Sequence, residues 1–159
     1  MLRPATLDDV DALLAVLTAP DVARWWPNET RATVERYVRG ADEHTFVVER
    51  DGVTIGIIQY WEEDEPEYRH AGIDVALHPD AQGAGLGTDA VRAMARFLVH
   101  DRSHHRVTID PAADNARAIR CYEKVGFRPV GVMREYERGP DGSFHDGLLM
   151  DLLARELSD

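Results

Sequence analysis

Apolar residues recur at helical spacing near the start of the chain and predict two helices. The first begins after Thr6, a capping residue with Asp9 three positions further on, and Pro20 ends it. The second runs from about Thr30 to Arg39. The apolar side of the first helix consists of Val10, Leu13, Leu14 and Leu17.

Alternating or continuously apolar stretches predict strands, and two further helices lie between them. Asp51-Gly52 is the strongest short signal for a hairpin turn. The later helices run from the glycine-rich segment 82–88 to about residue 100, and from 115 to 125, with Gly126 suited to end the latter. The expected strands cover residues 1–5, 45–50, 53–61, 71–78, 106–110, 127–137 and 144–153. This order predicts one α/β (α+β) domain over residues 1–159, with a mixed, mostly antiparallel twisted sheet of six to seven strands and about four helices.

Composition and charge exclude several classes of function. The 159 residues carry a net charge of −11, which argues against nucleic-acid binding and is compatible with a cationic substrate. The one cysteine, Cys121, excludes an internal disulfide and a cysteine zinc cluster. The longest stretch without charged residues, Gly52 to Trp61, is too short to span a membrane, and no signal peptide is visible. We therefore expect a cytoplasmic monomer or homodimer that binds no membrane.

A glycine-rich segment between a strand and a helix is the first candidate for chemistry. Its alternating glycines allow backbone N–H groups to converge on a phosphate at a helix N-terminus, although a tight turn explains the spacing equally well. A P-loop needs a lysine here, and the only lysine is Lys124. A dinucleotide fingerprint needs glycine where Thr88 stands. The segment consists of Gln82, Gly83, Ala84, Gly85, Leu86, Gly87 and Thr88.

A second motif, NARAIRCYEKVGF, covers Asn115 to Phe127. Asn115, Ala118 and Tyr122 stand at i, i+3 and i+7, so they share one helix face about 10 Å long. That face presents an amide, a small gap and a phenol in a row. Tyr122 is either a proton donor in an active site or a half-buried core tyrosine.

Together the two motifs resemble the GNAT family of N-acetyltransferases, and they cover about residues 72 to 127. The resemblance implies the GNAT fold and an acetyl-CoA cofactor. It also implies that the strand from Ile73 to His78 splays from its neighbour, where a backbone N–H stabilises the oxyanion. Tyr122 then protonates the departing CoA thiolate. By the same resemblance the cofactor contacts are the backbone of Val75 and Leu77, the segment from Gln82 to Thr88, Asn115 and Ala118.

Asp74 interrupts the apolar strand AGIDVAL. It is either a base or amine anchor at a cationic site, or a solvent-facing residue of an alternating strand. Cys121 lies on a different helix face from Tyr122, so we expect a small buried side chain rather than a nucleophile. The seven histidines show no metal-ligand spacing, and we expect no metal.

Acidic residues gather in the segment from Glu62 to Glu67 and in the last hairpin, at Glu135, Glu137, Asp141 and Asp146. Such runs are usually solvated loops, but beside an amine site they can hold a polycation. The pattern DP-x-x-x-N-x-RAIRCYEKVGF from Asp110, the GID ending at Asp74 and the pair Trp25-Trp26 resemble aminoglycoside 6'-N-acetyltransferases. That resemblance makes Asp74 the base. It places the acceptor at Trp26, Gln59, Glu63, Asp64 and Asp110.

These features favour direct attack of a polycationic amine on acetyl-CoA in a ternary complex, with the 6'-amine of an aminoglycoside as the expected acceptor. Another amine remains an alternative: a polyamine, a protein N-terminus or a siderophore precursor. A non-catalytic acyl-CoA sensor is an alternative of a different class.

Overall fold

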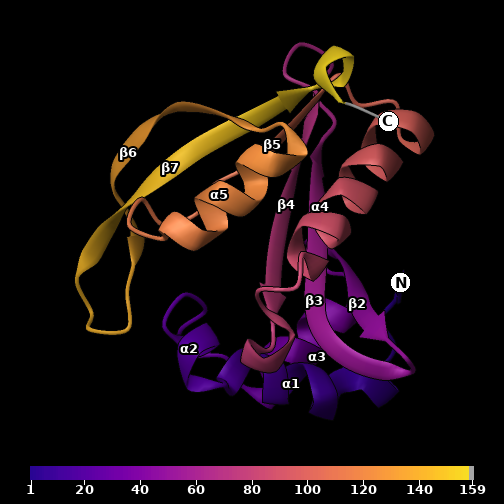
Figure 1. The fold of residues 1–159 in the computed structure, drawn as a ribbon, viewed down its shortest axis with the longest axis vertical. Coiled ribbons are helices and arrows are strands. Elements are labelled where there is room, and N and C mark those ends of the chain that lie inside the picture. The colour runs from indigo at the N-terminus through magenta and orange to yellow at the C-terminus, as the bar shows by residue number, and fades with distance from the viewer. Residues whose placement is uncertain (158–159) are drawn as a thin grey trace.

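The strands of the protein form one sheet of seven, with the order β1-β2-β3-β4-β5-β7-β6, in a computed structural model that describes residues 1–157 (Figure 1). Neighbouring strands are antiparallel except for the parallel pair β4 and β5. The predicted mixed, mostly antiparallel sheet is therefore confirmed; the last two residues of the expected domain, 158–159, lie outside the described ones. The strands are β1 (Leu2–Pro4), β2 (His44–Arg50), β3 (Val53–Glu63), β4 (His70–Leu77), β5 (Arg106–Ile109), β6 (Arg128–Arg138) and β7 (Phe144–Leu153).

The helices show one departure from the predicted pattern. Pro20 does not merely end the first helix: it stands in the first turn of a separate short helix, where a missing N–H is no loss. The expectation of about four helices missed this element. None of the helices within residues 1–157 is long and apolar enough to cross a membrane. The α-helices are α1 (Val10–Thr18), α2 (Pro20–Ala23), α3 (Arg31–Arg39), α4 (Leu86–Arg96, continued by a π-helical turn at Phe97–Asp101) and α5 (Ala116–Val125).

Helices cover both faces of the sheet, and each face has its own apolar core. Side chains of α4 and α5 pack on one face, whereas α1, α2 and α3 pack on the other (Figure 1). Successive residues of a strand point to opposite faces. In β4, Ile73 and Leu77 belong to the α4–α5 core and Ala76 belongs to the α1–α3 core.

Two local signals in the sequence form the predicted turns. Asp51 and Gly52 both have positive φ, 51° and 78°, as a tight hairpin between β2 and β3 requires. Gly126 ends α5 with a φ of 117°, in the left-handed region that favours glycine. Both turns are therefore fixed by residues that tolerate this backbone conformation.

The sheet opens between β4 and β5. These strands pair only at Ala71↔Val107 and Gly72↔Thr108, although β4 continues to Leu77. The opening confirms the splay expected for this strand. We call the space beyond Gly72 the β4–β5 gap.

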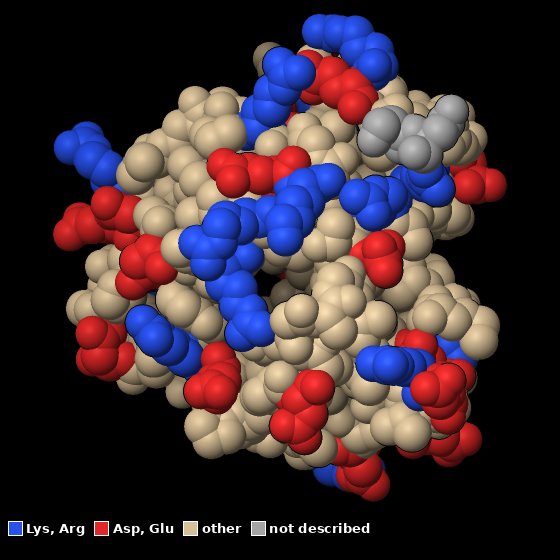
Figure 2. Space-filling model, in the orientation of Figure 1, with Lys and Arg blue, Asp and Glu red and all other residues tan. Residues whose placement is uncertain are grey.

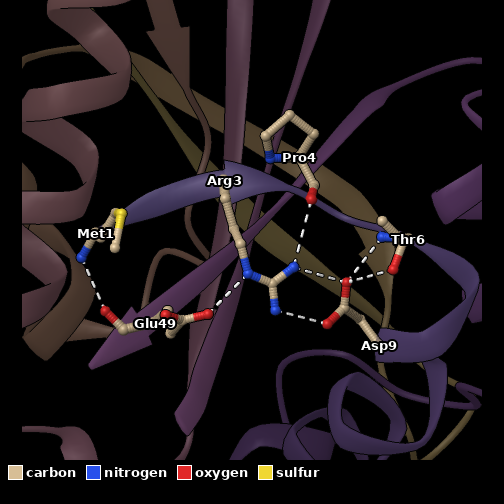
Figure 3. A network of polar contacts seen from close by, with 6 residues as sticks. All are labelled: Met1, Arg3, Pro4, Thr6, Asp9 and Glu49. Atoms are coloured by element: carbon tan, nitrogen blue, oxygen red, sulfur yellow. Dashed lines mark hydrogen bonds and ion pairs between the residues drawn. The ribbon is translucent and has the colours of Figure 1, made fainter. Parts of the chain in front are cut away.

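A polar network anchors the N-terminal strand (Figure 3). The Arg3 guanidinium donates to both carboxylate oxygens of Asp9, at 2.9 and 2.7 Å, and to Glu49 at 2.7 Å. The Thr6 backbone N–H also donates to Asp9, at 2.8 Å. The Arg3 hydrogen bonds lower the pKa of Asp9 from 3.8 to about 2. The network thus ties β1 to β2 and to the start of α1.

Asp9→Asn is expected to destabilise the protein by roughly 1–2 kcal/mol at pH 7, because the amide keeps the shape of the cap but loses the charge facing Arg3. Since the native pKa of Asp9 is depressed, its stabilising effect is complete above pH about 4 and is lost as pH falls toward about 2. The difference between wild type and variant in urea unfolding should therefore shrink over that range. Asp8→Asn, at an exposed neighbour, is the control. A difference that is constant with pH would contradict this account.

Candidate active site

A polar row crosses the otherwise apolar α1–α3 face of the sheet. Thr45, Gln59 and Asp74 are in register on β2, β3 and β4. Gln59 Nε2 donates to Thr45 Oγ1 at 2.9 Å, and Thr45 Oγ1 donates to the Tyr37 carbonyl at 2.8 Å. The first two side chains therefore satisfy each other in the core. Asp74 stands at the end of the row, beside the β4–β5 gap.

A second carboxylate, Asp110, faces Asp74 across this gap. Extending the β4–β5 register by two residues places Asp110, the residue after β5, opposite Asp74. Tyr136 Oη, from β6, donates to Asp110 Oδ2 at 2.6 Å. The gap is thus bordered by two acids that come from different strands.

The electrostatics of this pair follow from burial and from like charges. Burial is the main cause that raises the pKa of Asp74 from 3.8 to about 7, and Asp110, Glu43 and Glu137 add to it. The pKa of Asp110 is also raised by burial, while the hydrogen bond from Tyr136 opposes that shift. A carboxyl group with a pKa near 7 can both accept a proton at neutral pH and hold a cation that relieves the repulsion.

Backbone groups of β4 line the same gap. The His78 N–H donates to the Ile55 carbonyl at 2.8 Å, and such pairs alternate along an antiparallel ladder. By that alternation, the N–H and C=O groups of Val75 and Leu77 point away from β3 and into the gap. Gln82 Nε2 donates to the Leu77 carbonyl at 2.8 Å, which agrees with this direction. Val75 and Leu77 therefore offer to the gap backbone groups that are not paired with a neighbouring strand, at the positions that the family resemblance implies for cofactor contacts.

The glycine-rich segment forms a turn that leads into α4. Gly83 and Gly85 have φ values of 86° and 81°, so both need the freedom of glycine, and Gly85 is the N-cap of α4. The first N–H groups of a helix have no partner within the helix. Arg117 Nη1, from α5, donates to Gln82 Oε1 at 2.6 Å and brings a positive charge beside this turn. The geometry suits a phosphate group.

Basic side chains gather on the face that carries this turn. Arg117, Arg120 and Lys124 are exposed at i, i+3 and i+7 of α5, so they share one side of the helix. Figure 2 shows basic residues as a band over α5 and α4, next to a hollow in the surface. A chain with net charge −11 thus presents a positive surface where the glycine turn lies.

The helix α5 carries the candidate proton donor. Tyr122 is only 7% exposed, and burial raises its pKa, so the phenol keeps its proton at neutral pH. The neighbouring Cys121 and the acids Asp74 and Asp110 raise that pKa further. The spacing of Asn115 predicted that it shares a helix face with Ala118, but Asn115 is instead the N-cap of α5. Its Oδ1 accepts from the Ala118 N–H at 3.2 Å.

Cys121 lies beside the start of α4 rather than with Tyr122. Its Sγ is 3.3 Å from Thr88 Oγ1, and the residue is half-buried. This position agrees with a packing role for the thiol. Thr88 itself therefore contacts α5 through its side chain, which leaves its backbone N–H as the group available to a phosphate.

Some residues predicted for the acceptor side are brought to Asp74 and others are not. Trp26 packs against the α1–α3 core, on the sheet face that Asp74 occupies. Trp25 instead stacks under the Arg24 guanidinium, 4.6 Å from its ring centre. Glu63 and Asp64 lie at the turn from β3 to β4, at the paired end of β4 and away from the gap.

Three residues near the pair were missed as parts of the site: Glu43, Tyr136 and Glu137. Glu137 could be recognised only as one acid of the last hairpin. Glu43 stands next to the start of β2, and no motif marks it. Tyr136 reaches Asp110 because β6 is irregular, which no short pattern announces.

The two sides of the gap thus have different chemistry. A glycine turn, a basic helix and a protonated phenol belong to the α4–α5 face, whereas carboxyl groups border the gap from the α1–α3 face. Such a site can hold a phosphate-bearing molecule on one side and a cationic amine on the other. Between them, Asp74 can remove a proton and Tyr122 can supply one.

Comparison with known proteins gives a consistent result. Residues 1–128 match the acetyltransferase (GNAT) domain family. Aminoglycoside N(6')-acetyltransferase type 1 of Klebsiella pneumoniae is 35% identical over 162 residues, which cover 89% of this chain and 78% of that protein. Spermidine N(1)-acetyltransferase of Escherichia coli (strain K12) is 27% identical and covers 85% of this chain and 76% of that protein.

A solved structure of an aminoglycoside acetyltransferase in complex with coenzyme A and kanamycin has the same fold. Its TM-score is 0.79 at 28% identity, and the superposition covers 98% of this chain and 95% of that one.

Asp74→Asn is expected to stabilise the protein at alkaline pH. The native pKa of Asp74 lies above its usual 3.8, at about 7, so ionising it costs stability as pH rises through this interval. At pH 8 the variant should be more stable by ~2 kcal/mol after allowing for solvent screening, and below pH about 4 the gain should vanish. Urea unfolding at several pH values measures this, with exposed Asp42→Asn as control. A variant less stable than wild type at pH 8 would contradict the buried-charge account.

Proposed function

The chain belongs to the acetyltransferase (GNAT) family of acetyl-CoA-dependent N-acetyltransferases, and we propose that its acceptor is the 6'-amine of an aminoglycoside. The observation that carries this proposal is the pair of carboxyl groups, Asp74 and Asp110, across the β4–β5 gap. Like charges held together in a half-buried site are relieved by a cation. The 35% identity to an aminoglycoside N(6')-acetyltransferase supports an acceptor with several amines.

The residues on the α4–α5 face suit acetyl-CoA. The left-handed Gly83 and Gly85, the free N–H groups at the start of α4 and the charge of Arg117 fit its phosphates. The backbone of Val75 and Leu77 fits its pantetheine arm. The full proposed cofactor site consists of Val75, Leu77, Gln82, Gly83, Ala84, Gly85, Leu86, Gly87, Thr88, Asn115 and Ala118.

When bound, acetyl-CoA supplies a thioester carbonyl that an amine can attack directly. Asp74 anchors the ammonium group and accepts its proton, because its pKa near 7 matches this task. A backbone N–H in the gap, that of Val75, stabilises the negative charge on the carbonyl oxygen. Tyr122 then protonates the leaving sulfur.

The acceptor lies on the acidic side of the gap. Asp110 contacts a second amine, and Trp26 and Gln59 line the pocket on the same sheet face as Asp74. Glu63 and Asp64, at the β3–β4 turn, serve as outer charges that attract a polycation rather than as direct partners of Asp74. A polyamine is the second candidate, because the 27% identical spermidine N(1)-acetyltransferase acts on a cation of similar character.

Substitution at the two proposed catalytic residues should separate their roles. Tyr122→Phe is expected to lower kcat about 100-fold and leave KM for acetyl-CoA nearly unchanged, because only proton transfer is lost. In wild type, kcat/KM for the acceptor should rise with pH through about 7 as Asp74 ionises, and Asp74→Asn should abolish that rise. Tyr60→Phe, which removes another buried hydroxyl from the α4–α5 core, is the control. Unchanged kinetics in both site variants would overturn the assigned roles.

The acceptor itself is tested by measuring release of the CoA thiol with paired aminoglycosides that carry an amine or a hydroxyl at the 6' carbon. Release with the amine member alone is the expected result. Release with spermidine or peptides but with neither aminoglycoside would replace the acceptor and keep the chemistry. Binding of acetyl-CoA without release of the CoA thiol in the presence of any amine would indicate a non-catalytic acyl-CoA sensor.

A further inference from the structure

Strand β6 leaves its regular pairing with β7 close to the gap. The register shifts between Met133 and Glu137, so the residues between them form a bulge. Within it, Glu135 has a φ of 47°, which is unusual for a residue other than glycine. The Asp146 carboxylate accepts from the Glu135 N–H at 2.8 Å and holds this conformation. The bulge is strained and is held by its own hydrogen bond, so its backbone conformation is fixed. That conformation sets the direction in which the Tyr136 side chain points.

The position of the Tyr136 ring against β7 also depends on one particular residue. A β-carbon at Gly147, on β7, would lie 2.8 Å from Tyr136 Cδ1 and 3.2 Å from Met133 Cε. Only glycine therefore lets the ring lie this close to β7. From this position the Tyr136 hydroxyl donates to Asp110 at 2.6 Å, although half of the residue remains exposed.

The chain that follows Asp110 is fixed by the same part of β7. The Leu148 N–H donates to the Pro111 carbonyl at 2.8 Å, and the Ala113 N–H donates to the Asp146 carbonyl at 2.9 Å. An isolated bridge joins Ala112 to Gly147. Residues 146–148 thus hold both partners of the Tyr136–Asp110 hydrogen bond.

We propose that Tyr136 is a positioning residue for the acceptor: its hydroxyl fixes the Asp110 carboxylate across the gap from Asp74, so that the pair receives a cationic amine. This inference rests on the proposed function. It adds a residue of the last hairpin, outside the 1–128 family match, to the determinants of acceptor binding.

The charges around Asp110 give the direction of the effect. The hydrogen bond from Tyr136 lowers the pKa of Asp110 against the effect of burial. Loss of the hydroxyl therefore leaves Asp110 protonated to a higher pH, so the site carries less negative charge over the range in which Asp110 titrates. The other titratable groups that face this region are Asp74 on β4, Glu43 before β2, Tyr122 on α5, Glu137 on β6 and His145 on β7.

Tyr136→Phe tests the proposal because it removes only the hydroxyl. KM for the acceptor should rise about 10-fold while KM for acetyl-CoA stays unchanged, since a charge-assisted hydrogen bond is lost on the acceptor side alone. The acid limb of kcat/KM, which Asp74 sets, should move to lower pH, because a less charged Asp110 raises the pKa of Asp74 less. Gly147→Ala, which displaces the ring, should reproduce both changes. Tyr68→Phe removes an exposed hydroxyl and is the control.

A measurement without substrate separates this inference from the proposed function. Carbon NMR of labelled aspartates, with Asp110 assigned by Asp110→Asn, should show the Asp110 pKa raised by about one unit in Tyr136→Phe. The inference stands on this shift together with the acceptor-specific rise in KM for whichever amine is turned over. An unshifted Asp110, or a shift with unchanged acceptor KM, overturns it. Failure of every aminoglycoside as acceptor, with the NMR shift present, counts against the proposed function instead.

Discussion

The parallel pairing of β4 with β5 stops after two residue pairs, and the chain beyond Asp110 follows β7 instead. The Pro111 carbonyl accepts from the Leu148 N–H on β7 at 2.8 Å, so the backbone groups of this residue face β7 and not β4. Two more regular pairs beyond Gly72↔Thr108 would have brought Asp74 and Asp110 side by side on neighbouring strands, where like charges are destabilising. The opening in the sheet therefore lies where the chain after β5 follows β7 rather than β4. The carboxyl pair and the unpaired backbone of β4 both depend on it.

The stability of the fold and the chemistry of the site rest on different residues. Two apolar cores and the Arg3–Asp9–Glu49 network hold the layers together. The acids at the gap do the opposite, since a raised pKa means that their ionised form is less stable in the folded protein than in water. The hairpin of β6 and β7 stores additional strain at Glu135. The apolar layers must offset both.

Signals carried by neighbouring residues were readable from the sequence. The Asp51-Gly52 turn, the end of α5 at Gly126 and the glycine turn before α4 depend on backbone conformations that few residue types adopt. Contacts across the sheet were not readable in this way. Asp110 and Asp74 could be linked only through a family resemblance, and the approach of Tyr136 to Asp110 depends on a bulge whose anchors lie on another strand. The placement of the acidic segment at Glu63 and Asp64 likewise depends on which end of β4 opens.

The β4–β5 gap lies between two faces of the sheet that carry different chemical groups. The glycine turn lies on one face and the carboxyl groups on the other, so two ligands that bind these groups approach the gap from opposite sides of the sheet. Neither ligand therefore has to bind before the other, and neither product has to be released before the other. The architecture therefore suits a random kinetic order. In such an order, initial-rate lines for the two substrates intersect, and each product inhibits chiefly on the side of the gap where it binds.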